Sequence, residues 1–182
     1  MVIESSVVTD ILTGTGDSSP SQLFNVNGTL FFQVSDSIHS AELWKSNGTA
    51  AGTALVRDIN VTGGSSYPAM LVDTGNVILF SAYDNIHGRE LWKSDGTPAG
   101  TALVKDIYTG TSNSMPTDPV NVSGTLFFVA DDGVHGQELW KSDGTTSGTV
   151  MVKDIYTGTY SWYPWKLTPM NGTLYFFAGN QL

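Results

Sequence analysis

The stretch that decides the fold is HGQELWKSDGTTSGTVMVKDI, residues 135–155. Nearly the same string occurs as HGRELWKSDGTPAGTALVKDI at residues 87–107 and as HSAELWKSNGTAAGTALVRDI at residues 39–59, so that successive copies are 48 residues apart. Repeats of about 40–50 residues that are rich in β-forming side chains are typical of propeller blades. The period therefore predicts a chain built from equivalent β units.

The period extends beyond these stretches into both ends of the chain. Aspartate, proline and phenylalanine recur in register four times each, in the order Asp10, Asp58, Asp106 and Asp154, then Pro20, Pro68, Pro116 and Pro164, then Phe32, Phe80, Phe128 and Phe176.

Each unit predicts four short antiparallel strands. In the first unit they are QLFNVNG (22–28), TLFFQVSD (29–36), AELWKSNG (41–48) and TALVRDI (53–59). Hydrophobic and polar side chains alternate within them, and Asn-Gly, Ser-Gly or Asp-Gly steps separate the first strand from the second and the third from the fourth, where hairpin turns need positive φ. Helical periodicity is nearly absent. We expect an all-β, propeller-like fold with four-stranded antiparallel blades.

The repeat also predicts the organisation of the chain. One repeat domain spans residues 1–182, with a closing strand at 1–12, three blades at 13–60, 61–108 and 109–156, and a partial fourth blade at 157–182. Four full periods would need 4 × 48 = 192 residues, ten more than the chain has. The missing positions match residues 135–144, which form the third strand of a blade.

We therefore expect the last blade to be split between the two ends of the chain and to lack one strand. An open slot in a sheet exposes backbone N–H and C=O groups to further pairing. Three explanations remain open: the chain is trimmed from a longer repeat protein, a second chain supplies the strand or completes a larger ring, or the fourth blade tolerates three strands.

Composition excludes several function classes. Eight Lys and Arg residues stand against 17 Asp and Glu, giving a net charge of −9, so nucleic acid and anionic membranes are unfavourable partners. No apolar run approaches the roughly 20 residues that a membrane span needs, and we expect no membrane insertion. The absence of cysteine rules out disulfides, thiolate metal sites and cysteine nucleophiles.

An Asp-x-x-His step followed by Trp occurs once in every copy. Such residues suit a metal site or an acid–base pair. A catalytic site has to occur only once, whereas a network that holds each blade must occur in each blade. We therefore expect a structural hydrogen-bond network, without a catalytic or metal-binding role, from Asp36, His39 and Trp44, from Asp84, His87 and Trp92, and from Asp132, His135 and Trp140.

The KSDGTxxGT loops raise the possibility of calcium. A calcium site uses six to eight oxygen ligands, whereas each loop offers one carboxylate, and Asn47 replaces it in the first copy. A turn in which the Asp or Asn side chain caps its own backbone is the better interpretation.

Aromatic residues gather in the loops where the copies diverge. Variable loops on a constant scaffold are where binding usually resides, and aromatic rings beside polar side chains suit either sugar rings or a protein interface. The candidate ligand-binding residues are Tyr67, Tyr108, Tyr156, Tyr160, Trp162, Tyr163 and Trp165.

The three segments at residues 42–59, 90–107 and 138–155 resemble the bacterial ELWxxDGT repeat family, with Asn47 as the one departure from its Asp. With the half-units at the ends, the resemblance covers essentially the whole chain. It implies β-propeller-like repeats in large secreted or surface-attached bacterial proteins, and it implies neither an enzymatic activity nor a cofactor.

These observations favour a non-enzymatic binding or assembly module that is extracellular or on the bacterial cell surface. Its partners would be further copies in a homo-oligomer, or further repeats of the same protein, engaged through the incomplete blade. The alternative is a multivalent lectin that binds a glycan through the loops between blades. No Ser-His-Asp elbow, phosphate-binding glycine loop or HExxH motif is present, and we expect no cofactor and no metal.

Overall fold

The computed structural model describes residues 7–155, 157 and 163–179. These residues form fourteen strands in four antiparallel sheets and no helix, which confirms the all-β prediction. None of them belongs to a helix that could span a membrane.

Three sheets have four strands each, and every one of them lies within one repeat unit. The first sheet comprises β1 (Ser21–Val26), β2 (Thr29–Asp36), β3 (Ser40–Ser46) and β4 (Ala54–Arg57); the second comprises β5 (Ala69–Asp73), β6 (Ile78–Asp84), β7 (Gly88–Ser94) and β8 (Ala102–Lys105); the third comprises β9 (Thr117–Val122), β10 (Thr125–Asp131), β11 (Gln137–Ser142) and β12 (Val150–Lys153). In each sheet the strands follow one another in chain order, as the repeat predicts.

The turns form where the sequence places them. Asn27 and Gly28, between β1 and β2, have φ values of 49° and 84°, the left-handed conformation that a two-residue hairpin requires. The next sheets keep the register, because Phe32 pairs with Trp44, Phe80 with Trp92 and Phe128 with Trp140 on the two central strands.

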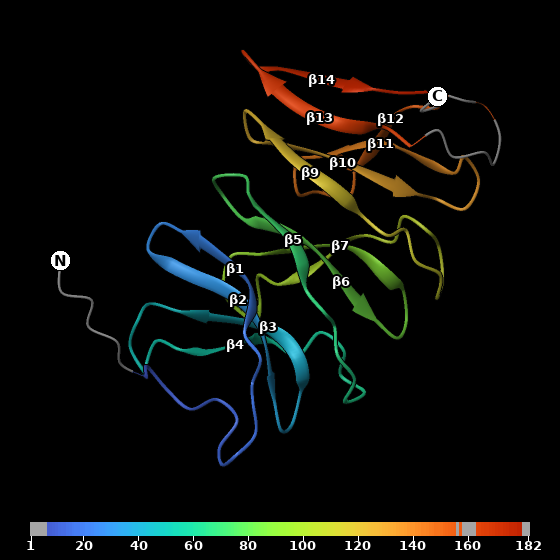
Figure 1. Ribbon diagram of the computed structural model, residues 1–182. Coiled ribbons are helices and arrows are strands. Elements are labelled where there is room, and N and C mark those ends of the chain that lie inside the picture. Colours follow the sequence, from blue (N-terminus) through green and yellow to red (C-terminus); the bar gives the residue numbers. More distant parts are fainter. Residues whose placement is uncertain (1–6, 156, 158–162, 180–182) are drawn as a thin grey trace.

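The chain ends in a hairpin of β13 (Trp165–Met170) and β14 (Thr173–Phe177), which is a separate two-stranded sheet. Among the described residues, this last sheet has two strands, whereas the other three have four. The described part of the N-terminal segment, residues 7–20, contains no strand. The first sheet and the hairpin lie at opposite ends of the molecule (Figure 1). The described strands thus form an open row of sheets, and residues 1–6 of the expected closing strand lie outside the described residues.

The sheets stack face to face through two hydrophobic cores. The first core joins Phe31, Leu43 and Val56 of the first sheet to Phe80 and Trp92 of the second. The second core joins equivalent residues of the second and third sheets. Its members are Leu79, Leu91, Val104, Ile107, Leu126, Phe128, Ala130 and Trp140. The first strands β1, β5, β9 and β13 also contact one another in sequence along the row (Figure 1).

An irregularity that the sequence does not reveal recurs in the first strand of every unit. The pairing with the second strand shifts register there, and one residue has positive φ at each shift. These residues are Gln22, Met70, Asp118 and Lys166, with φ between 50° and 62°. A bulge of this kind bends and twists a strand, and its recurrence gives all four units the same curvature.

Candidate functional site

The aspartate and histidine of the expected network pair in all three units. His39 Nδ1 lies 2.7 Å from Asp36 Oδ2, His87 Nδ1 lies 2.8 Å from Asp84 Oδ2, and His135 Nδ1 lies 2.7 Å from Asp132 Oδ2. The other carboxylate oxygen accepts backbone N–H bonds from the turn; Asp36 Oδ1, for example, accepts from Ile38 and His39. Each pair thus fixes the turn between the second and third strands of its sheet.

The tryptophan of each unit does not join this network. The indole nitrogens of Trp44, Trp92 and Trp140 are buried and have no hydrogen-bond partner. Trp92 and Trp140 lie instead in the two hydrophobic cores between sheets. Their role is packing against the preceding sheet, and the prediction of a three-residue hydrogen-bond network is wrong in this respect.

Among the described residues, no group of three or more His, Asp or Glu side chains could hold a metal ion. The hydrogen bond from Asp36 raises the pKa of His39, and that from Asp132 raises the pKa of His135. Both effects stabilise the protonated imidazole within a turn.

The KSDGTxxGT loops cap their own backbones, as expected. Asn47 Oδ1, Asp95 Oδ1 and Asp143 Oδ1 accept the N–H of the threonine two residues later at 3.1, 2.8 and 2.9 Å. The side chain that suggested calcium is thus bonded to its own turn.

A buried glutamate on the third strand joins each of the first two sheets to the sheet that follows. Glu42 is fully buried, and its carboxylate accepts the backbone N–H groups of Ile59, Asn60 and Ser66 at 3.2, 3.3 and 3.1 Å. The Ser66 hydroxyl donates a further bond of 2.5 Å. Ser66 in turn accepts, at its carbonyl oxygen, the N–H of Tyr83 on β6. We call this arrangement the Glu–Ser clasp.

The clasp recurs between the second and third sheets. Glu90 accepts the N–H groups of Ile107, Tyr108 and Ser114, and the Ser114 hydroxyl donates at 2.6 Å. Burial raises the pKa of both Glu42 and Glu90 to about 7, against the hydrogen bonds that lower it. Sequence reasoning missed the clasp, although Ser18, Ser66 and Ser114 recur at the repeat spacing two residues before a proline.

Basic side chains form a second link between neighbouring sheets. Lys45 Nζ donates to the Gly96 carbonyl at 2.7 Å and Lys93 Nζ to the Gly144 carbonyl at 3.0 Å, each 51 residues ahead. The acceptor at the same spacing from Lys141 would be residue 192, ten residues beyond Leu182.

The four candidate aromatic residues that the structure describes do not form one site. Tyr67 lies exposed between β4 and β5, whereas the ring of Tyr108 packs so closely over Gly133 that a Cβ there would lie 2.5 Å from it. The Tyr163 hydroxyl bonds to Thr117 and Asp118. Trp165 stacks on Phe177 with ring centroids 4.8 Å apart. Three further candidates lie outside the described residues: Tyr156, Tyr160 and Trp162.

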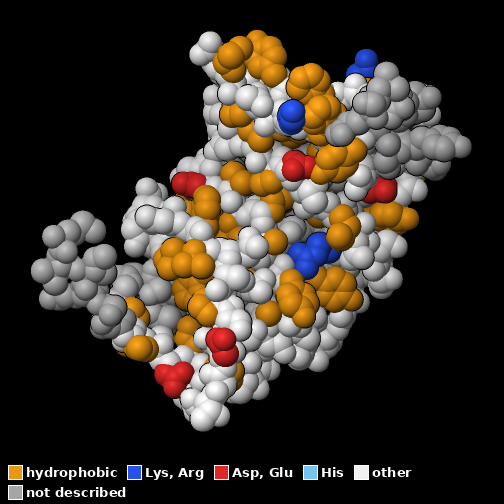
Figure 2. Space-filling model, viewed as in Figure 1, with side chains coloured by type: hydrophobic (Ala, Val, Ile, Leu, Met, Phe, Trp, Pro, Cys, Tyr) orange, Lys and Arg blue, Asp and Glu red, His pale blue; other side chains and the backbone are white. Residues whose placement is uncertain are grey.

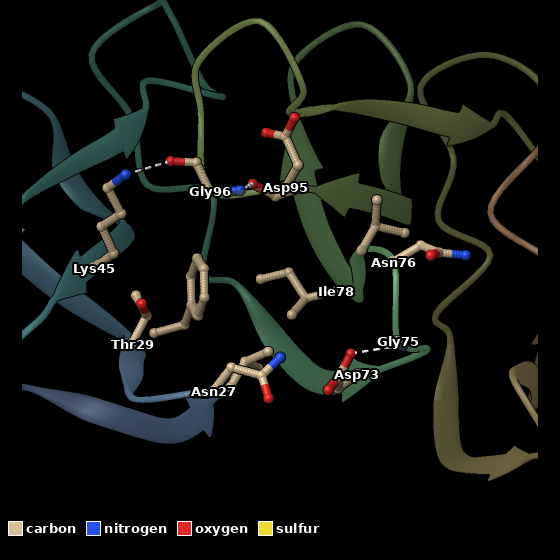
Figure 3. A pocket seen from close by; sticks show the side chains of 13 residues that line it. Asn27, Thr29, Lys45, Asp73, Gly75, Asn76, Ile78, Asp95 and Gly96 are labelled. Atoms are coloured by element: carbon tan, nitrogen blue, oxygen red, sulfur yellow. Dashed lines mark hydrogen bonds between the residues drawn. The ribbon is translucent and has the colours of Figure 1, made fainter.

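A hollow of about 250 Å³ lies between the first and second sheets (Figure 3). The lining of the hollow includes Asn27, Lys45, Asp73 and Ile78. The Lys45 ammonium donates a hydrogen bond to the Gly96 carbonyl. Small-molecule sites usually occupy about 300–1,000 Å³ and are mainly apolar. The hollow is smaller than such sites and its lining is polar. We interpret it as a gap between two sheets and not as a ligand site.

Exposed hydrophobic side chains gather at the C-terminal end of the row of sheets. Figure 2 shows them over the hairpin. Val152 on β12 is 45% exposed, whereas its repeat counterparts Val56 and Val104 are 1% and 3% exposed. The other members of this open C-terminal end are Val150, Met170, Tyr175, Phe176 and Phe177. Among the described strands, the hairpin contacts the third sheet through β13 and β9.

Comparisons with known proteins add no relationship. No protein-family model, no curated protein and no solved structure matches the chain. The open C-terminal end is the candidate site on geometric grounds, since it departs most from the repeat.

Proposed function

We propose that this chain is a non-enzymatic assembly module that binds further β-structure at its open C-terminal end. The observation that carries the proposal is the contrast among Val56, Val104 and Val152. The first two are buried against a following four-stranded sheet, whereas the third, which precedes the two-stranded hairpin, is exposed. Phe176 of the hairpin is also partly exposed, whereas its counterparts Phe80 and Phe128 are fully buried against the preceding sheet.

Two features favour binding at the open C-terminal end. Contiguous apolar side chains on the surface of a soluble protein commonly mark an interaction site. The free edge of β14, where the third strand of a complete unit would pair, presents backbone groups that another strand can satisfy. Binding there would bury apolar surface and complete the hydrogen bonding of the sheet in one step.

The setting proposed for this function is a propeller-like assembly. The contacts among the first strands of consecutive units are those expected of inner blade strands around an axis. A split fourth blade closed by the N-terminal strand, or a larger ring completed by other repeats, would extend this row. The resemblance to the bacterial ELWxxDGT repeats supports a location outside the cell or on its surface.

The experiment adds the missing strand. Extending the C-terminus with HGQELWKSDG supplies repeat positions 183–192, including the glycine carbonyl that Lys141 lacks. We expect the mass of the original chain, measured by light scattering, to rise with concentration, and that of the extended chain to rise much less. A scrambled ten-residue extension is the control. If the original chain stays a monomer at every concentration, the proposal is wrong.

Multivalent carbohydrate binding is the alternative proposal, and the exposed ring of Tyr67 favours it. The C–H face of a sugar could stack on this ring. A glycan array with the original chain and Tyr67→Ala tests it. Loss of a sugar signal in the variant would support the alternative, and an array without any signal would remove it.

A further inference from the structure

Each contact between consecutive sheets joins two different surfaces. We call the face of a sheet that packs on the following sheet its onward face, and the opposite face its backward face. In the first core the onward face contributes Phe31 and Leu43, and the backward face of the second sheet contributes Phe80 and Trp92. The second core repeats this pairing. An onward face thus fits a backward face, and the chain builds this contact twice.

The backward face of the first sheet has no sheet before it. Leu23 is 64% exposed, whereas its repeat counterpart Leu71 packs against the first core. Trp44 is partly exposed, whereas Trp92 is buried. Val7, which precedes the sheet, is also exposed. Phe32 and Val34 on the same face are buried, so one end of the molecule presents a backward face that is only partly covered.

The hairpin presents an unpartnered onward face at the other end. Its exposed residues Met170 and Tyr175 hold the repeat positions of Val26 and Phe31. Both counterparts pack in the first core, Phe31 as a buried member and Val26 at its margin. Phe177, on the same face of β14 as Tyr175, is also exposed.

We propose that a second copy of this chain docks the backward face of its first sheet on the onward face of the hairpin. The stack of sheets then continues in the 48-residue register from one copy to the next. This inference rests on the proposed assembly function and names its partner and orientation. The docked copy's residues 7–10 would enter the position of the fourth strand of the open unit, next to Val152.

The proposed contact is heterologous, because the two surfaces differ. Contacts of this kind form open chains or closed rings of copies, not two-fold dimers. Each copy carries a net charge of −9, so that copies repel one another at long range. Salt screens this repulsion, and association should strengthen as ionic strength rises.

Cross-linking tests the orientation directly, because the chain has no cysteine of its own. Leu23→Cys and Tyr175→Cys place one thiol on each proposed face, at positions whose counterparts Leu71 and Phe31 share the first core. An equimolar mixture treated with a short bis-maleimide should give a covalent dimer that contains one chain of each variant. Neither variant alone should give appreciable dimer, because head-to-tail docking puts its thiol opposite a side chain without sulfur.

The control uses a position that no interface covers. Ile38, Ile86 and Val134 occupy the same repeat position and are exposed in every unit. Ile38→Cys mixed with Tyr175→Cys should therefore not cross-link above background. Dimers from either single variant alone would show a self-complementary contact and overturn the proposal.

Light scattering on the same samples separates this inference from the function on which it rests. Association without the mixed cross-link would reject the head-to-tail orientation and leave the assembly function standing. A chain that remains a monomer at all concentrations and ionic strengths would reject both.

Discussion

The contact between the first and second sheets and the C-terminal end of the molecule are built from the same repeat positions but differ in what covers them. Between the two sheets, hydrophobic side chains are buried, the Glu–Ser clasp is complete and a lysine crosses to the next sheet. At the C-terminal end, the hairpin covers part of the third sheet and the remaining positions are exposed. Burial of these repeat positions thus depends on whether a further sheet lies against them.

The largest expected effect concerns the phenylalanine shared by all units. Phe80→Ala opens a cavity in the first core and should lower the free energy of unfolding by about 3–5 kcal/mol. Phe176→Ala at the open end should cost about 1 kcal/mol or less, because the ring is already partly hydrated. Urea unfolding of both variants measures the difference. Equal losses would show that the hairpin is packed as tightly as the inner sheets.

Shortening the equivalent valines compares a buried position with the exposed C-terminal one through a smaller change in side-chain volume. Val104→Ala should destabilise the fold by about 2 kcal/mol, because it removes buried methyl groups and leaves a cavity. Val152→Ala should change stability by less than about 0.5 kcal/mol and should weaken association instead. Thermal unfolding and light scattering report the two effects separately. A Val152→Ala variant that associates as strongly as the original chain would argue against the proposed surface.

The clasps make the stability of the inner contacts depend on pH. Burial raises the pKa of Glu42 and Glu90 to about 7, whereas the ordinary value is 4.5. The folded protein keeps protons that the unfolded chain releases at lower pH, so stability falls as the pH rises from about 5 to about 8. We expect a loss of at least about 1 kcal/mol over this range, since one pKa unit corresponds to about 1.4 kcal/mol.

The raised pKa values of His39 and His135 act in the same direction, and a variant must separate the two contributions. The double variant Glu42→Gln/Glu90→Gln should flatten the pH dependence of the urea midpoint. An unchanged pH profile in this variant would assign the dependence to the histidines. A wild-type stability that rises with pH would contradict the account of the clasps.

The smallest expected effect concerns the lysines. Lys93→Met removes the bond to the Gly144 carbonyl and should cost about 0.5–1 kcal/mol, since the ammonium is partly solvated. Lys141→Met should be nearly neutral in the original chain and should become costly once HGQELWKSDG is added. If the extension does not change the cost of Lys141→Met, the added segment does not occupy the missing third strand.

Much of the fold could be predicted because the relevant rules are local. Alternating side chains and Asn-Gly or Asp-Gly steps act within a few residues, so the strands and turns of each unit follow from the printed sequence. The Asp36–His39 pair is also local, since its members share one turn. The role of Trp92 was harder to predict, because its ring packs in the core that it shares with the preceding sheet and forms no hydrogen bond with the Asp84–His87 pair.

The Glu–Ser clasp could not be predicted in the same way. Glu42 and Ser66 are 24 residues apart, and only the stacking of two sheets brings the carboxylate to the backbone of the linking segment. Whether the row of sheets closes into a ring could not be predicted from the sequence either. The distance between the two ends of the row depends on the twist added at each stacking step, which a count of repeat positions does not give.

The length of the unit and the four strands within it could be read from the sequence, because they follow from periodicity and short-range turn chemistry. Only the tertiary structure decided which equivalent residues are buried and which are exposed. A side chain such as Val152 has similar neighbours along the chain to those of Val56, and its burial depends on whether another sheet lies against it. That difference arises from packing between units, which no single copy of the repeat contains.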